Sequence, residues 1–281
     1  MNLKYIYEDL PRGEKALNAQ AVAFKLDSGG DEIYGQVSTP ACNPGEKFPL
    51  LLLCHGYPGL EQNRDIAHAI RCTGFVTAIF HYRGCWGSKG YYGMEHCMED
   101  TELVCRYLME HCEEYCIETR QVFLLGHSMG GFMVINALAR GEVKAQGAIL
   151  IAPGDMPIIP REELLMPMKT SMLNLKTPDA HVLELEAHKE QWAFAYAAKK
   201  LPDIPYLLIG GEQDTAVPTR QHIDPINEIL LSMHYRVERV DLDDNHIFSS
   251  TRNSLIRIVA EWLYKRTSTN NANIHGAGLS T

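Results

Sequence analysis

A serine flanked by glycines is the pattern in this chain that most clearly predicts chemistry. Gly126-His127-Ser128-Met129-Gly130 follows the apolar run Val122–Leu125 and precedes a segment of helical character. In a strand-turn-helix with the pattern G-x-S-x-G, the serine lies on a strained turn that exposes its hydroxyl, and the glycines let strand and helix approach closely. The pattern predicts that Ser128 is a nucleophile; the alternative is an ordinary turn between two elements.

The residues that could activate this serine lie further along the chain. A serine hydroxyl is a weak nucleophile, so it needs a base, and the base needs a partner that orients it. Asp214 comes just after an apolar run, where its carboxylate could accept a hydrogen bond from an imidazole; Glu212 and Asp224 are the other nearby acids. His246 alone among the 12 histidines combines a loop placement with the chain order acid, then histidine. We therefore expect Ser128, Asp214 and His246 to act together.

Two backbone N–H groups are expected to bind the negative charge that acyl transfer places on a substrate oxygen. One is the N–H of Met129, directly after the nucleophile, and the other should come from the loop that follows an early strand. That loop reads His55-Gly56-Tyr57-Pro58-Gly59. We assign the second donor to the backbone of Tyr57, with Gly56 letting the chain turn close to the substrate. A Gly/Pro loop without a catalytic part is the alternative.

Together these features resemble the α/β-hydrolase superfamily over roughly residues 20 to 265. More narrowly, HGYPGLEQN, the later FHYRGCWGSKG, GHSMGGF and a single lid are similar to a bacterial branch of esterases and peptidases. This branch includes feruloyl and cinnamoyl esterases and small relatives of the prolyl oligopeptidases. The resemblance implies a triad of Ser128, Asp214 and His246, with Tyr57 and Met129 as oxyanion donors, and it does not fix the substrate.

The elements that must position these residues alternate between strand-like and helix-like segments, which indicates an α/β fold with a mostly parallel sheet. Six short apolar runs are typical of buried strands, at 48–54, 75–82, 121–125, 148–152, 205–209 and 236–242. The runs 21–26 and 32–38 flank a glycine-containing turn and predict an antiparallel hairpin at one edge. We thus expect an eight-stranded sheet covered on both faces by helices, at about 62–73, 97–111, 130–140, 218–232 and 250–265.

One connection is too long for an ordinary crossover, because about fifty residues separate the fourth and fifth buried strands. We predict a core formed by residues 1–154 and 203–266, a lid insertion at 155–202 and a disordered polar tail at 267–281. The methionines and aromatic residues of the insertion either pack against the core or contact a substrate. In the segment 82–90, Arg83 either lines a pocket or ties loops together while Trp86 packs.

Composition excludes several classes of function. Apolar residues make up 46% and charged residues 22%, as in ordinary globular proteins. Because 26 Lys and Arg stand against 35 Asp and Glu, the net charge is −9, and no nucleic-acid partner is expected. No apolar stretch reaches the roughly 18 residues of a membrane span. Without an export signal, a cytoplasmic location and no membrane partner are expected. The eight cysteines are predicted to be free thiols, and neither a metal nor a cofactor is expected. The oligomeric state stays open.

These features predict a serine hydrolase that cleaves small carboxylic esters through an acyl-enzyme. The same residues would also suit an aminopeptidase or amidase, in which Glu162 and Glu163 of the insertion are candidates to hold a substrate ammonium. A non-catalytic ligand-binding scaffold is the third hypothesis, since a fold does not dictate a function. Such a scaffold would usually have lost part of the triad.

Overall fold

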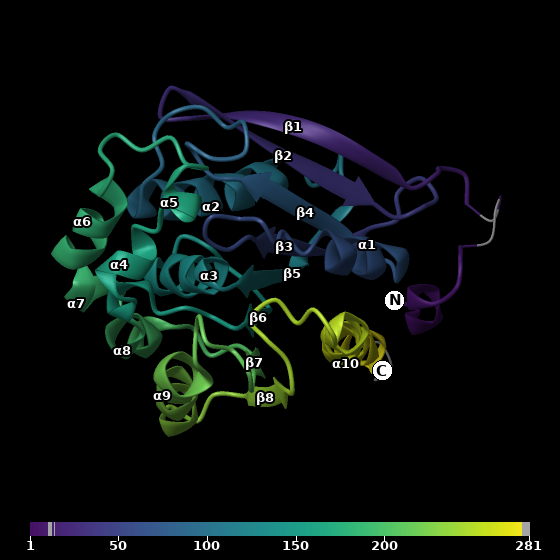
Figure 1. Cartoon of the computed structure of the whole chain (residues 1–281). Coiled ribbons are helices and arrows are strands. Elements are labelled where there is room, and N and C mark those ends of the chain that lie inside the picture. The colour runs from purple at the N-terminus through teal and green to yellow at the C-terminus, as the bar shows by residue number, and fades with distance from the viewer. Residues whose placement is uncertain (11–12, 14, 277–281) are drawn as a thin grey trace.

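An eight-stranded sheet forms the centre of the molecule, for which a computed structural model describes residues 1–10, 13 and 15–276 (Figure 1). Its strands are β1 (Gln20–Ser28), β2 (Asp31–Thr39), β3 (Phe48–Cys54), β4 (Val76–His81), β5 (Ile117–His127), β6 (Gly147–Ile151), β7 (Tyr206–Gly211) and β8 (Val237–Leu242). They lie in the order β1-β2-β4-β3-β5-β6-β7-β8. β1 and β2 pair antiparallel, as do β2 and β4, whereas every other pair of neighbours is parallel. The predicted mostly parallel sheet with a hairpin edge is confirmed.

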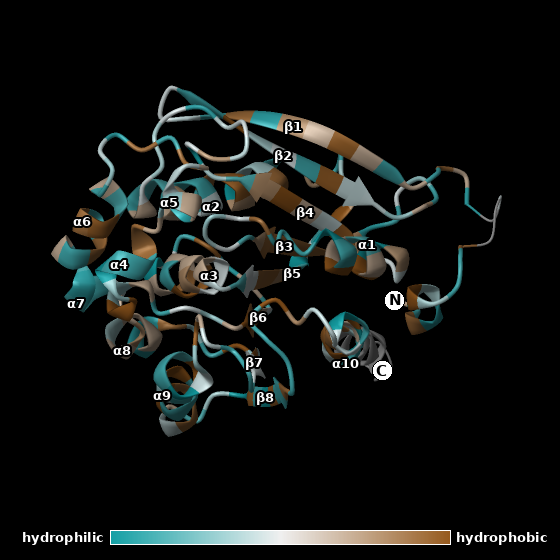
Figure 2. Ribbon diagram, in the orientation of Figure 1, coloured by the Kyte–Doolittle hydropathy of each residue, from teal (hydrophilic) through white to brown (hydrophobic). Residues whose placement is uncertain are grey.

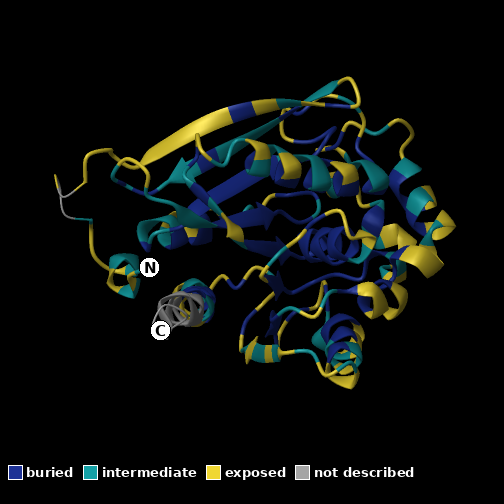
Figure 3. Ribbon diagram, turned by 180° about the vertical axis from the view of Figure 1, so that it is seen from behind, coloured by how far each residue is buried: buried dark blue, intermediate teal, exposed yellow. Residues whose placement is uncertain are grey.

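The central strands are buried on both faces because their apolar residues are continuous. In β3, Leu50 and Leu52 face one apolar cluster while Leu51 and Leu53 face the other, as alternation along a strand requires. Figure 2 shows β3 and its neighbour β4 largely in the hydrophobic colour. The edge strand β1 is mostly exposed, as its yellow ribbon in Figure 3 shows. The core therefore lies in two layers, one on each side of the parallel strands.

Long helices cover these two faces. On one face lie α1 (Arg64–Cys72) and α10 (Arg252–Gly276), together with the short η1 (Leu3–Ile6) near the N-terminus (Figure 1). On the other lie α2 (Met94–Glu110), α3 (Met129–Arg140) and α9 (Thr219–Ser232). Trp262 of α10 and Phe132 of α3 are large side chains buried against the sheet from opposite sides. Helices on both faces were predicted, and this prediction is confirmed.

The segment 155–202 joins β6 to β7 through short helices rather than one long one. These are η2 (Met156–Ile158), α4 (Arg161–Leu164), α5 (Pro167–Thr170), α6 (Ala180–Ala187), α7 (Lys189–Trp192), α8 (Phe194–Ala197) and η3 (Ala198–Lys200). Trp192 and Phe194 are buried in the core cluster, whereas Met168 and Tyr196 are 62% and 48% exposed. Some apolar side chains of this segment therefore pack against the core and others stay accessible, and a contact with substrate stays a prediction.

Parallel strands bring the loops that follow them to one edge of the sheet. The carboxyl end of β3 leads into the loop 55–59, that of β4 into 82–93, and that of β5 into Ser128. β6 leads into the segment 155–202, while β7 and β8 end just before Asp214 and His246. Residues that are far apart in the chain therefore meet at this edge.

The last helix differs from its predicted end. α10 continues to Gly276, although the sequence predicts a helix only to about 265 and a polar tail without regular structure beyond it. A helix that is already formed adds residues at little cost, so even weak helix formers extend it. Residues 277–281 of the predicted tail lie outside the described residues. Among the described residues, no helix is long and apolar enough to cross a membrane.

Candidate active site

Ser128 occupies a strained turn between β5 and α3. Its φ of 57° and ψ of −122° lie in a region that L-residues rarely adopt. The turn is held from both sides, since the Ser128 N–H donates to Ile151 O at 2.9 Å and the Gly154 N–H donates to Ser128 O at 3.0 Å. The predicted sharp turn at this serine is what the structure contains.

The glycines around Ser128 are required by close approach of backbones. A Cβ on Gly126 would lie 2.2 Å from Gly130 O, and a Cβ on Gly130 would lie 2.0 Å from Cys54 O. Contacts this short are not tolerated, so any side chain would push α3 away from β3 or β5. The two glycines thus bring the first turn of α3 directly against the end of the sheet, as their spacing predicts.

Asp214 and His246 are joined by a hydrogen bond. His246 Nδ1 lies 2.6 Å from Asp214 Oδ2, and the Asp214 side chain is fully buried. The other oxygen, Oδ1, accepts the backbone N–H groups of Ala216 and Val217 at 2.9 and 2.8 Å. A carboxylate that is held in this way accepts a hydrogen bond from the Nδ1–H group and leaves Nε2 of His246 free to act as a base. The alternatives Glu212 and Asp224 make no such contact with His246.

His127 links the turn at Ser128 to the loop of His246. Its Nε2 lies 2.9 Å from His246 O, and the two rings are 5.0 Å apart. A carbonyl can only accept, so Nε2 carries the proton and donates it. Burial lowers the pKa of His127 to about 3, so the ring is neutral. The described contacts include no hydrogen bond between the Ser128 hydroxyl and the His246 ring; in unliganded sites such bonds are often long and tighten when substrate binds.

The loop 55–59 passes directly beside Ser128. A Cβ on Gly56 would lie 3.1 Å from the Cβ of Ser128, so only glycine lets the loop come so near without displacement. Within the described part of the chain, the backbone N–H groups of Tyr57 and Met129 have no hydrogen-bond partner. Met129 also begins α3, where the partial positive charge of the helix N-terminus favours an anion. Both assigned donors are therefore available to a ligand at this point.

A second buried acid and histidine, Asp155 and His222, contact each other, and no motif in the sequence indicates either residue. The Asp155 N–H donates to His222 Nδ1 at 3.0 Å, and burial lowers the pKa of His222 to about 4. Burial also raises the pKa of the Asp155 carboxyl from 3.8 to about 6, and its Oδ1 has no hydrogen-bond partner among the described residues. The signal that could have found Asp155 is its position in the loop that directly follows the buried strand β6.

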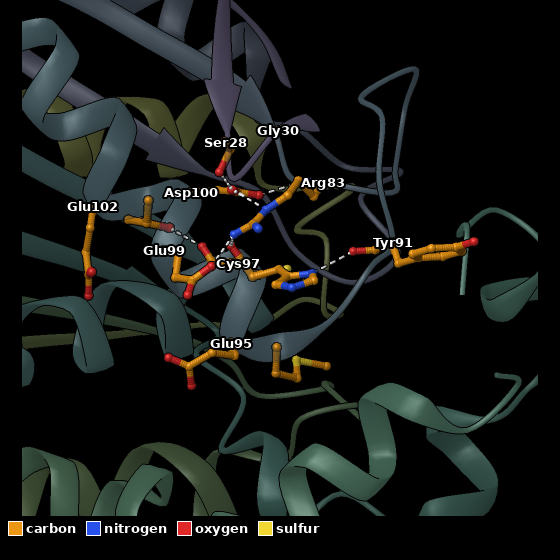
Figure 4. Close-up of polar contacts among 12 residues, drawn as sticks. Ser28, Gly30, Arg83, Tyr91, Glu95, Cys97, Glu99, Asp100 and Glu102 are labelled. Atoms are coloured by element: carbon orange, nitrogen blue, oxygen red, sulfur yellow. Dashed lines mark hydrogen bonds and ion pairs between the residues drawn. The ribbon is translucent and has the colours of Figure 1, made fainter. Parts of the chain in front are cut away.

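Arg83 ties loops together, as one of its two predicted roles required (Figure 4). Its Nε donates to Asp100 Oδ1 at 2.8 Å and its backbone N–H donates to Asp100 Oδ2 at 2.7 Å. The hydroxyl of Ser28, at the end of β1, donates to the same carboxylate at 2.6 Å, and Glu99 pairs with the guanidinium. Trp86 does not pack inside: it is 40% exposed, and its Nε1 donates to Pro58 O at 2.9 Å. The segment after β4 is thereby fixed against α2 and against the loop 55–59.

The described residues contain no group of three or more His, Cys, Asp or Glu side chains that could hold a metal ion. All eight cysteines are free thiols, and five of them, Cys42, Cys54, Cys85, Cys97 and Cys105, are buried. Glu162 of α4 is exposed and Glu163 is half-buried.

Comparison with known families and proteins finds a matching family model and curated relatives. The model of the family described as "Serine aminopeptidase, S33" matches residues 45–194, which include Tyr57, Ser128 and Met129 but end before Asp214 and His246. An uncharacterized 31.7 kDa protein in the traX-finO intergenic region of Escherichia coli is 33% identical over 98 residues. The matched segment spans 34% of this chain and only 34% of the length of that relative.

Solved structures share the fold at low identity. Est1E from Butyrivibrio proteoclasticus, in a structure with ferulic acid bound, has a TM-score of 0.66 at 17% identity and covers 87% of this chain and 99% of its own. An acylaminoacyl peptidase from Pyrococcus horikoshii has a TM-score of 0.69 at 17% identity, covering 89% of this chain and 42% of its own. A bacterial brefeldin A esterase has a TM-score of 0.67 at 18% identity, covering 94% and 82%. This likeness establishes the α/β-hydrolase fold.

Proposed function

Because this chain belongs to the serine aminopeptidase (S33) family of α/β-hydrolases, we propose that this serine hydrolase cleaves small carboxylic esters through an acyl-enzyme on Ser128. The observation that carries the proposal is the 2.6 Å hydrogen bond between His246 and Asp214, at the sheet edge where the strained turn holds Ser128. A nucleophile, a base and an orienting acid at one edge are the parts that acyl transfer needs.

In the proposed mechanism, His246 Nε2 accepts the proton of the Ser128 hydroxyl as Oγ attacks the ester carbonyl. The backbone N–H groups of Tyr57 and Met129 stabilise the oxyanion that forms, an effect of about 3 kcal/mol per donor. The imidazolium then gives its proton to the departing alcohol while Asp214 stabilises its charge. A water molecule, deprotonated by His246, attacks the acyl-enzyme and releases the acid.

Two considerations favour an ester over an amide. An alcohol is the easier leaving group, so a site with the common triad cleaves esters with less assistance. The structure of Est1E, which was solved with ferulic acid, aligns over 99% of its length with this chain, whereas the acylaminoacyl peptidase aligns over only 42% of its own. The region that aligns with this chain is thus nearly the whole of a protein solved with ferulic acid bound.

Aminopeptidase or amidase activity is the second candidate, and the description of the matching family favours it. An exopeptidase needs a carboxylate that holds the substrate ammonium. Of the two candidates that the sequence offers, Glu163 is half-buried in α4 and Glu162 is exposed.

A panel of substrates tests both candidates. We would measure hydrolysis of para-nitrophenyl esters of graded acyl length, methyl ferulate and aminoacyl para-nitroanilides, with the wild type and Ser128→Ala. Ser250→Ala is the matched control, because Ser250 is an exposed serine in the loop after His246. Ester hydrolysis that Ser128→Ala abolishes and Ser250→Ala retains is the expected result. Turnover of the anilides alone would move the assignment to an aminopeptidase, and activity that survives in Ser128→Ala would refute the mechanism.

A further inference from the structure

Three aromatic rings from distant parts of the chain meet beside the candidate active site. Tyr57 comes from the loop after β3, Tyr92 from the segment before α2, and His181 from α6 of the segment 155–202. The Tyr57 ring is 5.6 Å from that of His181 and 6.0 Å from that of Tyr92, and the latter two are 6.2 Å apart. Tyr92 and His181 are buried. We call these three residues the aromatic cluster.

Hydrogen bonds join the Tyr57 side chain to the segment 155–202. Its hydroxyl lies 2.6 Å from Leu164 O and 3.0 Å from His181 Nε2, and Nε2 lies 3.3 Å from the same carbonyl. Because the hydroxyl has a single proton, which it donates to Leu164 O, Nε2 must donate to the hydroxyl oxygen. His181 Nδ1 is buried without a partner among the described residues, and burial lowers the pKa of His181. A neutral His181 ring with its proton on Nε2 therefore satisfies the contacts among the Tyr57 hydroxyl, His181 and Leu164 O.

The other end of the cluster touches Met129. The Tyr92 hydroxyl lies 2.8 Å from Met129 Sδ, at the first residue of α3. The cluster thus contacts the side chains of both residues whose backbone N–H groups are the assigned oxyanion donors. These two donors come from separate segments, one in the loop after β3 and the other at the start of α3.

The segment 155–202 is anchored independently of Tyr57. Glu184 Oε2 accepts the N–H of Met94 at 2.6 Å, at the start of α2. Asn174 N–H donates to Gly84 O at 2.7 Å, and Asn174 O accepts the N–H of Tyr92 at 2.8 Å. Because the segment is fixed elsewhere, it can serve as a support for the Tyr57 side chain and, through it, for the loop 55–59.

We propose that the aromatic cluster is a positioning device: the Tyr57 hydroxyl, held by Leu164 O and His181, fixes the loop 55–59 so that the N–H groups of Tyr57 and Met129 converge on one oxygen. This inference rests on the proposed function, since it assigns the support of its oxyanion donors. An oxyanion donor acts only when it lies within hydrogen-bond distance of the developing charge, so a small displacement of the loop reduces the rate. The segment 155–202 thereby takes part in the reaction without touching the reacting atoms.

The test compares Tyr57→Phe with Tyr235→Phe. Tyr235 is a matched control, because its partly buried hydroxyl also donates to a backbone carbonyl, Leu201 O at 2.8 Å, but lies on the α9–β8 side of the sheet. The readouts are the rate at which an alkyl fluorophosphonate labels Ser128, kcat and KM for a para-nitrophenyl ester, and the thermal midpoint. The P=O oxygen of the probe needs the same donors as an ester carbonyl oxygen, so labelling does not depend on the natural substrate.

We expect Tyr57→Phe to slow labelling and lower kcat by about tenfold, less than the 10²–10³ that loss of a whole donor costs, with KM nearly unchanged. Tyr235→Phe should keep both rates while shifting the thermal midpoint by a similar amount. His181→Leu leaves the bond from the Tyr57 hydroxyl to Leu164 O, so it should slow both rates less than Tyr57→Phe does. The double variant should be no slower than Tyr57→Phe, because Tyr57→Phe already removes both contacts.

The outcomes separate this inference from the proposed function. If the wild type is labelled and Ser128→Ala is not, but Tyr57→Phe reacts at the wild-type rate, the positioning role is overturned while the serine hydrolase assignment stands. Equal rate losses in Tyr57→Phe and Tyr235→Phe would also overturn it, since the effect would then come from general destabilisation. If the wild type itself is not labelled, the proposed function fails and the inference fails with it.

Discussion

Replacing Asp214 by asparagine tests how His246 is held. In the native protein, Asp214 Oδ1 accepts the N–H groups of Ala216 and Val217 at 2.9 and 2.8 Å. Asparagine has the same shape, so its amide oxygen can still accept both. Its NH₂ group then faces His246 Nδ1, where a carboxylate oxygen lies at 2.6 Å in the native protein. Because the amide nitrogen donates, Nδ1 must accept, and the imidazole proton moves to Nε2. In that tautomer the ring cannot take the proton of Ser128.

The rate loss expected from this change is large. The equivalent substitution in the chymotrypsin-type triad lowers kcat by about 10⁴, which corresponds to about 5 kcal/mol in the activation free energy. We would measure kcat for a para-nitrophenyl ester in Asp214→Asn and in the control Asp224→Asn, which removes a carboxylate that pairs with Arg239 on the surface. The control should stay within about twofold, because exposed ion pairs contribute little. If folded Asp214→Asn keeps kcat within tenfold of the wild type, Asp214 does not orient the base and the reasoning is wrong.

Three further predictions concern stability. Gly130→Ala should lower the free energy of unfolding, measured by urea titration, by about 3 kcal/mol or more, because the new Cβ would lie 2.0 Å from a backbone oxygen. The control Gly141→Ala has open space around the new Cβ and a φ of 81°, so it should cost only about 1 kcal/mol. Arg83→Met should cost about 3–5 kcal/mol, since it leaves a buried carboxylate unpaired, and Arg161→Met, on the surface, less than about 1; equal losses would contradict this. Burial raises the folded-state pKa of Asp155 from 3.8 to about 6, so the ionised carboxylate costs stability as pH rises through that window. Asp155→Asn should therefore stabilise the protein by about 1–3 kcal/mol at pH 7.5 and by little near pH 4. A gain that is equal at both pH values would contradict the assignment.

The sequence predicted the sheet well because its central strands carry an unambiguous signal. The run from Leu50 to Leu53 has no polar residue, and such runs suit only a strand buried on both faces. β5 starts at Ile117, four residues before the predicted start, because the residues Glu118–Gln121 are polar and lie where the strand is still partly exposed. The short helices of the segment 155–202 span too few turns to give a periodic pattern.

For the candidate site, local patterns located residues but not their contacts. The turn at Ser128 could be placed because glycine spacing and the change from strand to helix are local features. The contact between His127 and the His246 carbonyl could not, since it joins residues more than a hundred positions apart. The same holds for the aromatic cluster, whose members come from three segments that only the folded chain brings together. Chain order identified Asp214 and His246 as candidates, but the 2.6 Å hydrogen bond between them depends on the tertiary structure.

Covalent labelling of Ser128 is the most direct measurement of the central claim. The intact protein would be treated with an alkyl fluorophosphonate, digested, and the modified residue identified by mass spectrometry, with Ser128→Ala and His246→Ala treated in parallel. The account predicts one adduct on Ser128 in the wild type, none in Ser128→Ala, and labelling in His246→Ala that is slower by at least about a hundredfold, as expected for loss of a general base. No adduct on the folded wild type, or an adduct on another residue that persists in Ser128→Ala, would contradict the account.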